Sequence, residues 1–313
     1  MAGKLYLVAT PIGNLEDITL RALKVLKEVD IIAAEDTRHT LGLLNHFEIS
    51  KPLVSYYKQI ESTRSAELVE KLMSGKNIAV VSDAGTPGIS DPGEQIVKCA
   101  IKAGIEVVPI PGACAFVNAL IASGMNTREF EFIGFLSAAK KDRREKLEEI
   151  KYETKTLIFY EAPHKLKQTL SDILEIMGDR NIVLAREITK IHEEFIRGKL
   201  TEVLNNLENV KGEFVIILEG NSESKKDIEL KNLNNLTLEE HYELYASKGF
   251  SKKEIIKQVA KDRNVEKNEI YQYFLEKWDF EKYLLIFLLY YYQNLIKKFK
   301  CKIMLFRFWW NMG

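Results

Sequence analysis

The chain contains 313 residues, which is enough for two domains and a small third one. Hydrophobic residues make up 46% and charged residues 29% of the sequence, fractions that are ordinary for a water-soluble globular protein. The 45 Lys and Arg residues balance the 45 Asp and Glu residues, so overall charge gives no indication of a nucleic-acid partner.

Residues 4–112 alternate between strand-like and helix-like patterns. Strands are expected at Leu5–Ala9, Asp30–Ala34, Ile78–Val81 and Glu106–Ile110, and helices at Thr19–Val29, Ala66–Met73 and Glu94–Ala103. Continuous apolar strands between amphipathic helices are typical of a mainly parallel sheet that helices cover on both faces. The sequence therefore predicts an N-terminal α/β domain over residues 1–112.

Residues 113–220 show a second set of elements in a different order. After a helix at Ala115–Ala122, strands are expected at Phe130–Phe135, Thr156–Tyr160, Ile182–Arg186, Phe195–Lys199 and Phe214–Leu218. Helices at about residues 140–150 and 165–177 separate the first three of these strands. The last strands follow one another closely, which favours antiparallel pairing. We expect a second α/β domain of different topology here.

The remainder of the chain is more polar and more basic. Residues 221–236 are interpreted as a linker, and short helices are expected at Leu238–Ser247, Lys252–Arg263 and Lys267–Leu275. The helical segment 237–276 is either a helix-turn-helix-like unit or a packing module without a ligand. After Gly220 there are 17 Lys and Arg against 13 Asp and Glu, which indicates either a surface for a polyanion or an ordinary solvated helical surface.

The tail at residues 277–313 is aromatic and basic. It fits a membrane-surface helix, a partner-binding helix or a tail from an altered reading frame, and we assign it no function.

Cysteine usage and apolar run lengths predict the compartment. Cys99, Cys114 and Cys301 share neither disulfide nor metal spacing, which favours a reducing compartment and no metal site. Met1 leads into the first strand without a signal-peptide pattern, and the longest apolar run, Tyr283–Tyr292, is too short to span a bilayer. We therefore expect a cytoplasmic protein without a membrane partner.

The densest chemical signal is the segment Ser82–Gly93, which directly follows a predicted strand. It holds three glycines, two prolines and two aspartates, so it is expected to turn sharply and rigidly. The carboxyl ends of parallel strands are where open α/β sheets bind ligands. The segment lacks the Lys-Ser/Thr ending of a phosphate loop and the spacing of a dinucleotide motif. It predicts close backbone contact with another kind of ligand, although an ordinary surface connection is the alternative.

Two further strand ends are expected at the same edge. Ala9–Asn14 leaves the first strand, and Glu35–His39 leaves the second with two carboxylates, a guanidinium and an imidazole. Such a cluster indicates a site. The alternative is a helix start, with Asp36 or Thr37 as its cap.

At these motifs the chain resembles the ribosomal RNA small subunit methyltransferase I family, which belongs to the tetrapyrrole methylases. The resemblance is carried by Val8–Thr19, Glu35–Arg38, Ser82–Gly93, Pro111–Ala115, Gly134–Leu136, Glu161–His164, Ala185–Lys190 and Gly212–Val215. It extends in consistent order over roughly residues 4–276. The chain departs from the family pattern at Ser137, where proline is usual, and at Lys165, where arginine is usual. Lysine keeps the positive charge of arginine but cannot donate the two parallel hydrogen bonds of a guanidinium.

The resemblance implies two α/β domains with S-adenosylmethionine in the cleft between them, a homodimer, and 2′-O-methylation of a cytidine ribose in 16S rRNA within the 30S subunit. Carried over by motif, the cofactor-lining residues are Pro11, Asp83, Ala84, Gly85, Thr86, Ile89, Cys114, Ala115, Tyr160, Ala185, Arg186, Gly212, Glu213 and Phe214. Two rival hypotheses remain: a methyltransferase of this fold acting on a small molecule or a protein, and a cofactor-binding module without activity.

A ribose hydroxyl is a poor acid, so a nearby base should help methyl transfer. The candidates are Glu35, Asp36 and a Lys190 of lowered pKa, among which the sequence does not choose. The adjacent Arg186 and Glu187 fit either the cleft or an interdomain ion pair. The residues expected to hold RNA phosphates are Arg38, Lys140, Lys141, Arg143 and Arg144. For the last four, a solvated helix face is the alternative.

Overall fold

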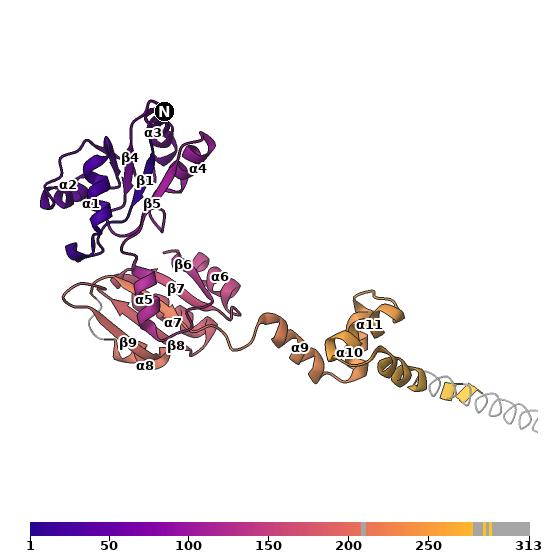
Figure 1. Cartoon of the computed structure of the whole chain (residues 1–313). Helices are drawn as coiled ribbons and strands as arrows, with labels where there is room; N and C mark the ends of the chain where they lie inside the picture. The colour runs from indigo at the N-terminus through magenta and orange to yellow at the C-terminus, as the bar shows by residue number, and fades with distance from the viewer. Residues whose placement is uncertain (208–210, 278–283, 286–287, 290–313) are drawn as a thin grey trace, which may run out of the picture. The chain divides into compact units, whose positions relative to one another are not determined.

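The computed structural model describes residues 1–207, 211–277, 284–285 and 288–289. It consists of two compact units, Met1–Ser224 and Lys225–Gly313. The first unit contains two sheets, each with its own helices, and the second is helical (Figure 1). None of the helices in the described ranges combines the length and the apolar content needed to cross a bilayer.

The first sheet is formed by the short apolar strands of the N-terminal domain. Its strands are β1 (Leu5–Val8), β2 (Ile31–Ala34), β3 (Leu53–Ser55), β4 (Ile78–Val81) and β5 (Val107–Ile110), in the order β3-β2-β4-β1-β5. All four neighbouring pairs are parallel. Parallel strands place their carboxyl ends at one edge, so the segments that leave β1, β2 and β4 meet there.

Helices cover both faces of this sheet, as predicted. They are α1 (Leu20–Glu28), α2 (Thr37–His46), α3 (Glu61–Met73) and α4 (Glu94–Lys102), with a short 3-10 helix, η1 (Leu15–Asp17), before α1. Leu26 of α1 and Leu44 of α2 share one hydrophobic core, whereas Leu68 of α3 and Ile96 of α4 share the core on the other face.

The sequence patterns predict no strand at β3, and at α2 they offer only the alternative of a helix start at Asp36 or Thr37. Asp36 caps α2, which confirms the helix start that was held as an alternative. Thr40 and Leu44 are the buried residues of this helix, too few to give a strong helical repeat. Strand β3 is three residues long and only partly buried, so its apolar pattern is equally short.

The second sheet is mixed. It contains β6 (Phe130–Phe135), β7 (Thr156–Glu161), β8 (Asn181–Arg186), β9 (Glu194–Lys199) and β10 (Phe214–Leu218), in the order β6-β7-β10-β8-β9. Strands β6 and β7 are parallel, and the other three pairs are antiparallel, which confirms the pairing predicted for the closely spaced strands. Helix α5 (Ala115–Ser123) packs on one face, and α6 (Lys140–Ile150), α7 (Pro163–Met177) and α8 (Leu200–Asn206) pack on the other.

The helical unit has a small core of its own. It contains α9 (Lys225–Asn235), α10 (Leu238–Ser247), α11 (Lys252–Arg263) and a helical segment at 267–277. Tyr242, Val259 and Phe274 lie in the core. Helix α9 occupies the stretch interpreted as a linker. It has no buried residue, which explains why the sequence shows no helical repeat there. The interpretation of the tail falls on residues that lie outside the described ranges, apart from 277, 284–285 and 288–289.

Candidate active site

A cavity of about 590 Å³ lies within the first unit, where segments from both sheets meet. Its lining from residues 1–112 includes Ile12, Glu35, Asp83, Ala84, Gly85, Thr86, Ile89, Ser90 and Asp91. Its lining from residues 113–220 includes Cys114, Ala115, Phe135, Tyr160, Glu161, Ala162, Pro163, His164, Ala185, Ile188, Lys190, Glu213, Phe214 and Val215. Most of the residues carried over by motif are therefore brought together in one cavity.

The loop after β4 is fixed against its neighbours by backbone contacts. The N–H of Thr10 donates to the carbonyl of Gly85 at 2.8 Å, and the N–H of Gly85 donates back at 3.1 Å. The hydroxyl of Thr86 donates to the carbonyl of Ala113 at 3.0 Å. Gly85 has a φ of +84°, and a Cβ there would lie 3.2 Å from the side chain of Ile12. The loop is thus tied to the end of β1 and to the segment before α5.

Three carboxylates from two strand ends line the cavity. Asp83 accepts a 2.9 Å hydrogen bond from the backbone N–H of Asp36, which ties the loop after β4 to the end of β2. Burial raises the pKa of Asp91 to about 6, the hydroxyl of Ser82 opposes this, and the charge of Asp83 adds to it. Burial also raises the pKa of Glu35, with Asp91 and Asp83 as further contributors. A carboxylate in this setting can accept a proton near neutral pH.

The candidate base Asp36 has a different role. Its carboxylate accepts the N–H of Arg38 at 2.8 Å as the cap of α2, and it also pairs with the guanidinium of Arg38 at 2.7 Å. These contacts with Arg38 lower the pKa of Asp36. Among the described residues that line the cavity, Asp36 is absent. Among the three candidate bases, Asp36 therefore has its carboxylate occupied by Arg38, and its role as the base stays a prediction.

Lys190 lines the cavity, but as a cation. Its ammonium lies 3.0 Å from Glu187 and 3.2 Å from Glu213. Burial by itself would lower the pKa of Lys190, but the hydrogen bonds and charges of Glu187 and Glu213 outweigh burial and raise it. A lysine of raised pKa stays protonated at neutral pH, so the expected base of lowered pKa is not found at Lys190.

Three residues assigned to the cofactor by motif, Pro11, Arg186 and Gly212, are not among the described lining, although each is next in sequence to a residue that is. The guanidinium of Arg186 lies 3.2 Å from Glu194 and donates to the carbonyl of Lys211 at 2.7 Å, so its ion pair lies within the second domain.

The second domain supplies a wall that the sequence analysis only partly anticipated. Tyr160 accepts the backbone N–H of Phe116 at 3.2 Å, and the rings of Phe135 and Tyr160 meet edge to face at 5.5 Å. Glu161 is 4% exposed, and its two carboxylate oxygens accept the backbone N–H of Ala162 at 2.9 Å and the hydroxyl of Thr169 at 2.6 Å. From the sequence, Phe135 and Glu161 are only members of family motifs and are not predicted to line a site. The spacing of residues does not show which way the side chains at a strand end point.

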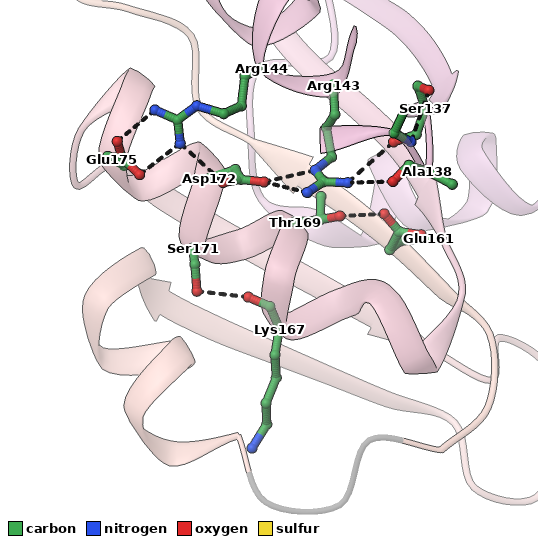
Figure 2. Close-up of polar contacts among 11 residues, drawn as sticks. Ser137, Ala138, Arg143, Arg144, Glu161, Lys167, Thr169, Ser171, Asp172 and Glu175 are labelled. Atoms are coloured by element: carbon green, nitrogen blue, oxygen red, sulfur yellow. Dashed lines mark hydrogen bonds and ion pairs between the residues drawn. The ribbon is translucent and has the colours of Figure 1, made fainter. Parts of the chain in front are cut away.

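Carboxylates of α7 hold the two arginines of the basic run at the start of α6 (Figure 2). Arg143 is 5% exposed, pairs with Asp172 at 2.7 Å and donates to the carbonyls of Ser137 and Ala138 at 3.3 and 3.2 Å. Arg144 also pairs with Asp172, at 3.1 Å.

A second carboxylate, Glu175, holds Arg144 at 2.5 Å. Arg143 therefore does not face RNA, and Arg144 is committed to two carboxylates. Lys140 and Lys141 are exposed, and so is Arg38. These three remain proposed phosphate contacts.

Comparison with known proteins gives one consistent family. The model of a family described as Tetrapyrrole (Corrin/Porphyrin) Methylases matches residues 4–204. The Ribosomal RNA small subunit methyltransferase I of Halalkalibacterium halodurans is 55% identical over 271 residues, which are 86% of this chain and 93% of the relative. The protein of that name from Bacillus subtilis is 52% identical with the same coverage, and the one from Escherichia coli O157:H7 is 45% identical over 88% of this chain and 96% of the relative.

Solved structures agree on the fold. The methyltransferase CobJ matches with a TM-score of 0.53 at 19% identity, over 71% of this chain and 95% of that one. The uroporphyrin-III C-methyltransferase from Thermus thermophilus, in complex with S-adenosylhomocysteine, matches with a TM-score of 0.51 at 18% identity, over 69% and 97%. The family model and the identities to the curated relatives show that the chain belongs to the ribosomal RNA small subunit methyltransferase I family, within the tetrapyrrole methylases.

Proposed function

We propose that the protein transfers a methyl group from S-adenosylmethionine to the 2′-hydroxyl of a cytidine ribose in 16S rRNA, within the 30S subunit. Membership of the family supplies the coarser part of this proposal, the methylation of small-subunit rRNA. The observation that supports a hydroxyl acceptor is the cavity, in which Glu35 and Asp91, both of raised pKa, line the same space as charged and aromatic side chains of the second domain. The choice of a cytidine ribose rests on the family resemblance.

The lining fits the proposed cofactor. Its volume of about 590 Å³ lies in the range of small-molecule sites. Ile12, Ile89 and Val215 offer an apolar slot suited to an adenine, and Glu35, Asp83 and Asp91 offer negative charge suited to a positively charged sulfur. When bound, the cofactor supplies an already activated methyl group.

The protein then has two tasks, which are to align the ribose hydroxyl and to remove its proton. Asp91 and Glu35 are the acceptors that the geometry supports, because both line the cavity and both have raised pKa values. Lys190, as a cation at the same cavity, stabilises negative charge that develops on the attacking oxygen.

Label transfer tests the function. Purified protein and cofactor labelled on the methyl group are incubated with undermethylated 30S subunits, with protein-free 16S rRNA and with a porphyrin precursor. We expect transfer to 30S subunits alone, with nucleoside digestion showing a 2′-O-methylcytidine. A methylated base, or transfer to the porphyrin precursor, would refute the proposal. Sedimentation of the same sample tests the homodimer that we also propose.

A further inference from the structure

A second hollow, of about 720 Å³, adjoins the cavity in the first unit. Its lining comes from the loop after β1, at Gly13–Glu16, from the loop between β8 and β9, at residues 187 and 189–192, and from His46 at the end of α2. Lys190 lines both the hollow and the cavity, so the two spaces share a boundary. Any acceptor must approach the methyl group through a space that adjoins the cofactor cavity.

At this boundary the loop after β1 and the side chain of Lys190 are in close contact. The backbone of Gly13 has a φ of +143°, and a Cβ there would lie 2.5 Å from Cγ and 2.6 Å from Cε of Lys190. The stem of Lys190 therefore passes directly over Gly13, while its ammonium is held by Glu187 and Glu213. The hydroxyl of Thr189 donates to the carboxylate of Asp17, which ties the two loops together beside the boundary.

The loop between β8 and β9 is held in a conformation that side chains rarely adopt. Glu187 has a φ of +48° and Thr189 a φ of +66°. The backbone N–H of Glu187 donates to the carbonyl of Glu213 at 3.1 Å, and that of Thr189 donates to the carboxylate of Glu193 at 2.6 Å. Strained residues that their surroundings hold in place cluster at ligand sites.

The side chains of the hollow suit an unpaired nucleobase. Ile191 is 97% exposed and Leu15 is 40% exposed, so an apolar contact surface is available from each loop. His46 and His192 add flat rings that both stack and hydrogen-bond. Within the described lining, Lys190 is the sole lysine or arginine, and Glu16 and Glu187 also line the hollow, so it suits the uncharged ring of a base better than a carboxylate or phosphate group.

We infer that this hollow binds one or two unpaired nucleotides of the rRNA next to the one that is methylated. Ile191 and His192 contact a base there, and Lys190 lies between that base and the cavity. The inference rests on the proposed function, because it assumes that the acceptor is RNA.

The experiment uses the full-length protein with Ile191→Ser, His192→Ala and the double variant. Removing a side chain that contacts a base, by apolar contact at Ile191 or by stacking at His192, should weaken binding to 30S subunits by roughly tenfold per residue. Affinity for S-adenosylhomocysteine should stay within about twofold, because neither residue lines the cavity. Ile191→Tyr replaces the apolar contact with an aromatic ring that can stack on a base and should retain binding. Ile101→Ser is the matched control, since Ile101 is 63% exposed on α4 and does not line the hollow.

The outcomes separate the inference from the proposed function. If the variants bind and methylate 30S subunits like the parent protein, the inference is overturned while the function stands. If the variants lose RNA binding but the parent methylates a base rather than a ribose, the proposed function fails while the inference stands. A change in sedimentation with unchanged RNA binding would assign the hollow to subunit contact instead, and would also overturn the inference.

Discussion

At the scale of single residues, position in the cavity and a raised pKa distinguish Asp91 and Glu35 from the carboxylates near them in the sequence. Asp91 and Glu35 line the cavity, whereas Asp36, next to Glu35 in the sequence, caps a helix and pairs with Arg38. Adjacent residues leave a strand end in different directions. The choice between them therefore depends on side-chain direction, which a sequence does not display.

We predict that Asp91→Asn slows single-turnover methylation by about 10² to 10⁴, as expected when a general base is removed. The pKa of Asp91 is raised to about 6, and a carboxylate accepts a proton only when ionised. The parental kcat/KM for the cofactor should therefore rise with pH through about 6 and then level off. Asp91→Asn should abolish that inflection, and Asp36→Asn should behave like the parent. If Glu35→Gln lost rate and Asp91→Asn did not, Glu35 would be the general base instead of Asp91.

Gly85 gives a second prediction at this scale. Its φ of +84° is unfavourable for other residues, and a Cβ would press on Ile12, which also lines the cavity. Gly85→Ala should therefore weaken binding of S-adenosylhomocysteine by about tenfold or more, measured by calorimetry. Gly104→Ala is the control, because Gly104 has a φ of +72° and no neighbour within 4 Å. Equal affinities in the two variants would contradict the contact role of the loop.

At the scale of elements, α7 holds two strand ends at the cavity. Asp172 of α7 fixes Arg143, which in turn holds the carbonyls that follow β6 (Figure 2). Thr169, one turn earlier on the same helix, holds Glu161 at the end of β7. The position of the second-domain wall thus depends on one helix.

We predict that Thr169→Val weakens cofactor binding and lowers the free energy of unfolding by about 1–3 kcal/mol, because a buried carboxylate is deprived of a hydrogen-bond donor. Ser171→Ala, on the exposed side of the same helix, should change the unfolding free energy by less than about 0.5 kcal/mol. Chemical denaturation and calorimetry measure both quantities. Normal affinity in Thr169→Val would show that Glu161 needs no support from α7.

The start of α6 gives a prediction about RNA. Lys140 and Lys141 are exposed, whereas Arg143 and Arg144 are held by carboxylates. Lys140→Ala with Lys141→Ala should reduce the slope of log affinity against log salt by roughly 0.7–0.9 for each RNA phosphate that the variant no longer neutralises. Lys24→Ala with Lys27→Ala, on α1, is a comparable pair at another place on the first unit. An unchanged slope would show that the exposed start of α6 is an ordinary solvated surface that does not contact RNA.

At the scale of the whole molecule, the chain divides into an α/β unit that contains the cavity and a helical unit with a separate core. Since every described residue that lines the cavity precedes residue 225, we predict that a protein ending at Ser224 binds S-adenosylhomocysteine within about twofold of the full chain. Its affinity for 30S subunits should fall, because the removed part carries more Lys and Arg than Asp and Glu. Calorimetry and 30S binding at several salt concentrations test both expectations, and failure of the truncated protein to bind the cofactor would contradict the first.

The sequence by itself determined the regular part of this protein. Apolar strands between amphipathic helices predicted the parallel sheet, the close spacing of the last strands predicted antiparallel pairing, and the long motifs indicated the family. These features are local, because each depends on the types and spacing of a few consecutive residues. The same locality explains the misses at α9 and β3, which bury too little to leave a repeat.

Only the tertiary structure decided what individual charges do. Arg143 and Lys140 belong to one basic run, yet one is buried against Asp172 and the other is exposed. Lys190 was one of three candidate bases, but Glu187 and Glu213 both pair with its ammonium and favour its charged form. A charge takes its role from partners that are distant in the sequence and close in space, and the fold alone brings those partners together.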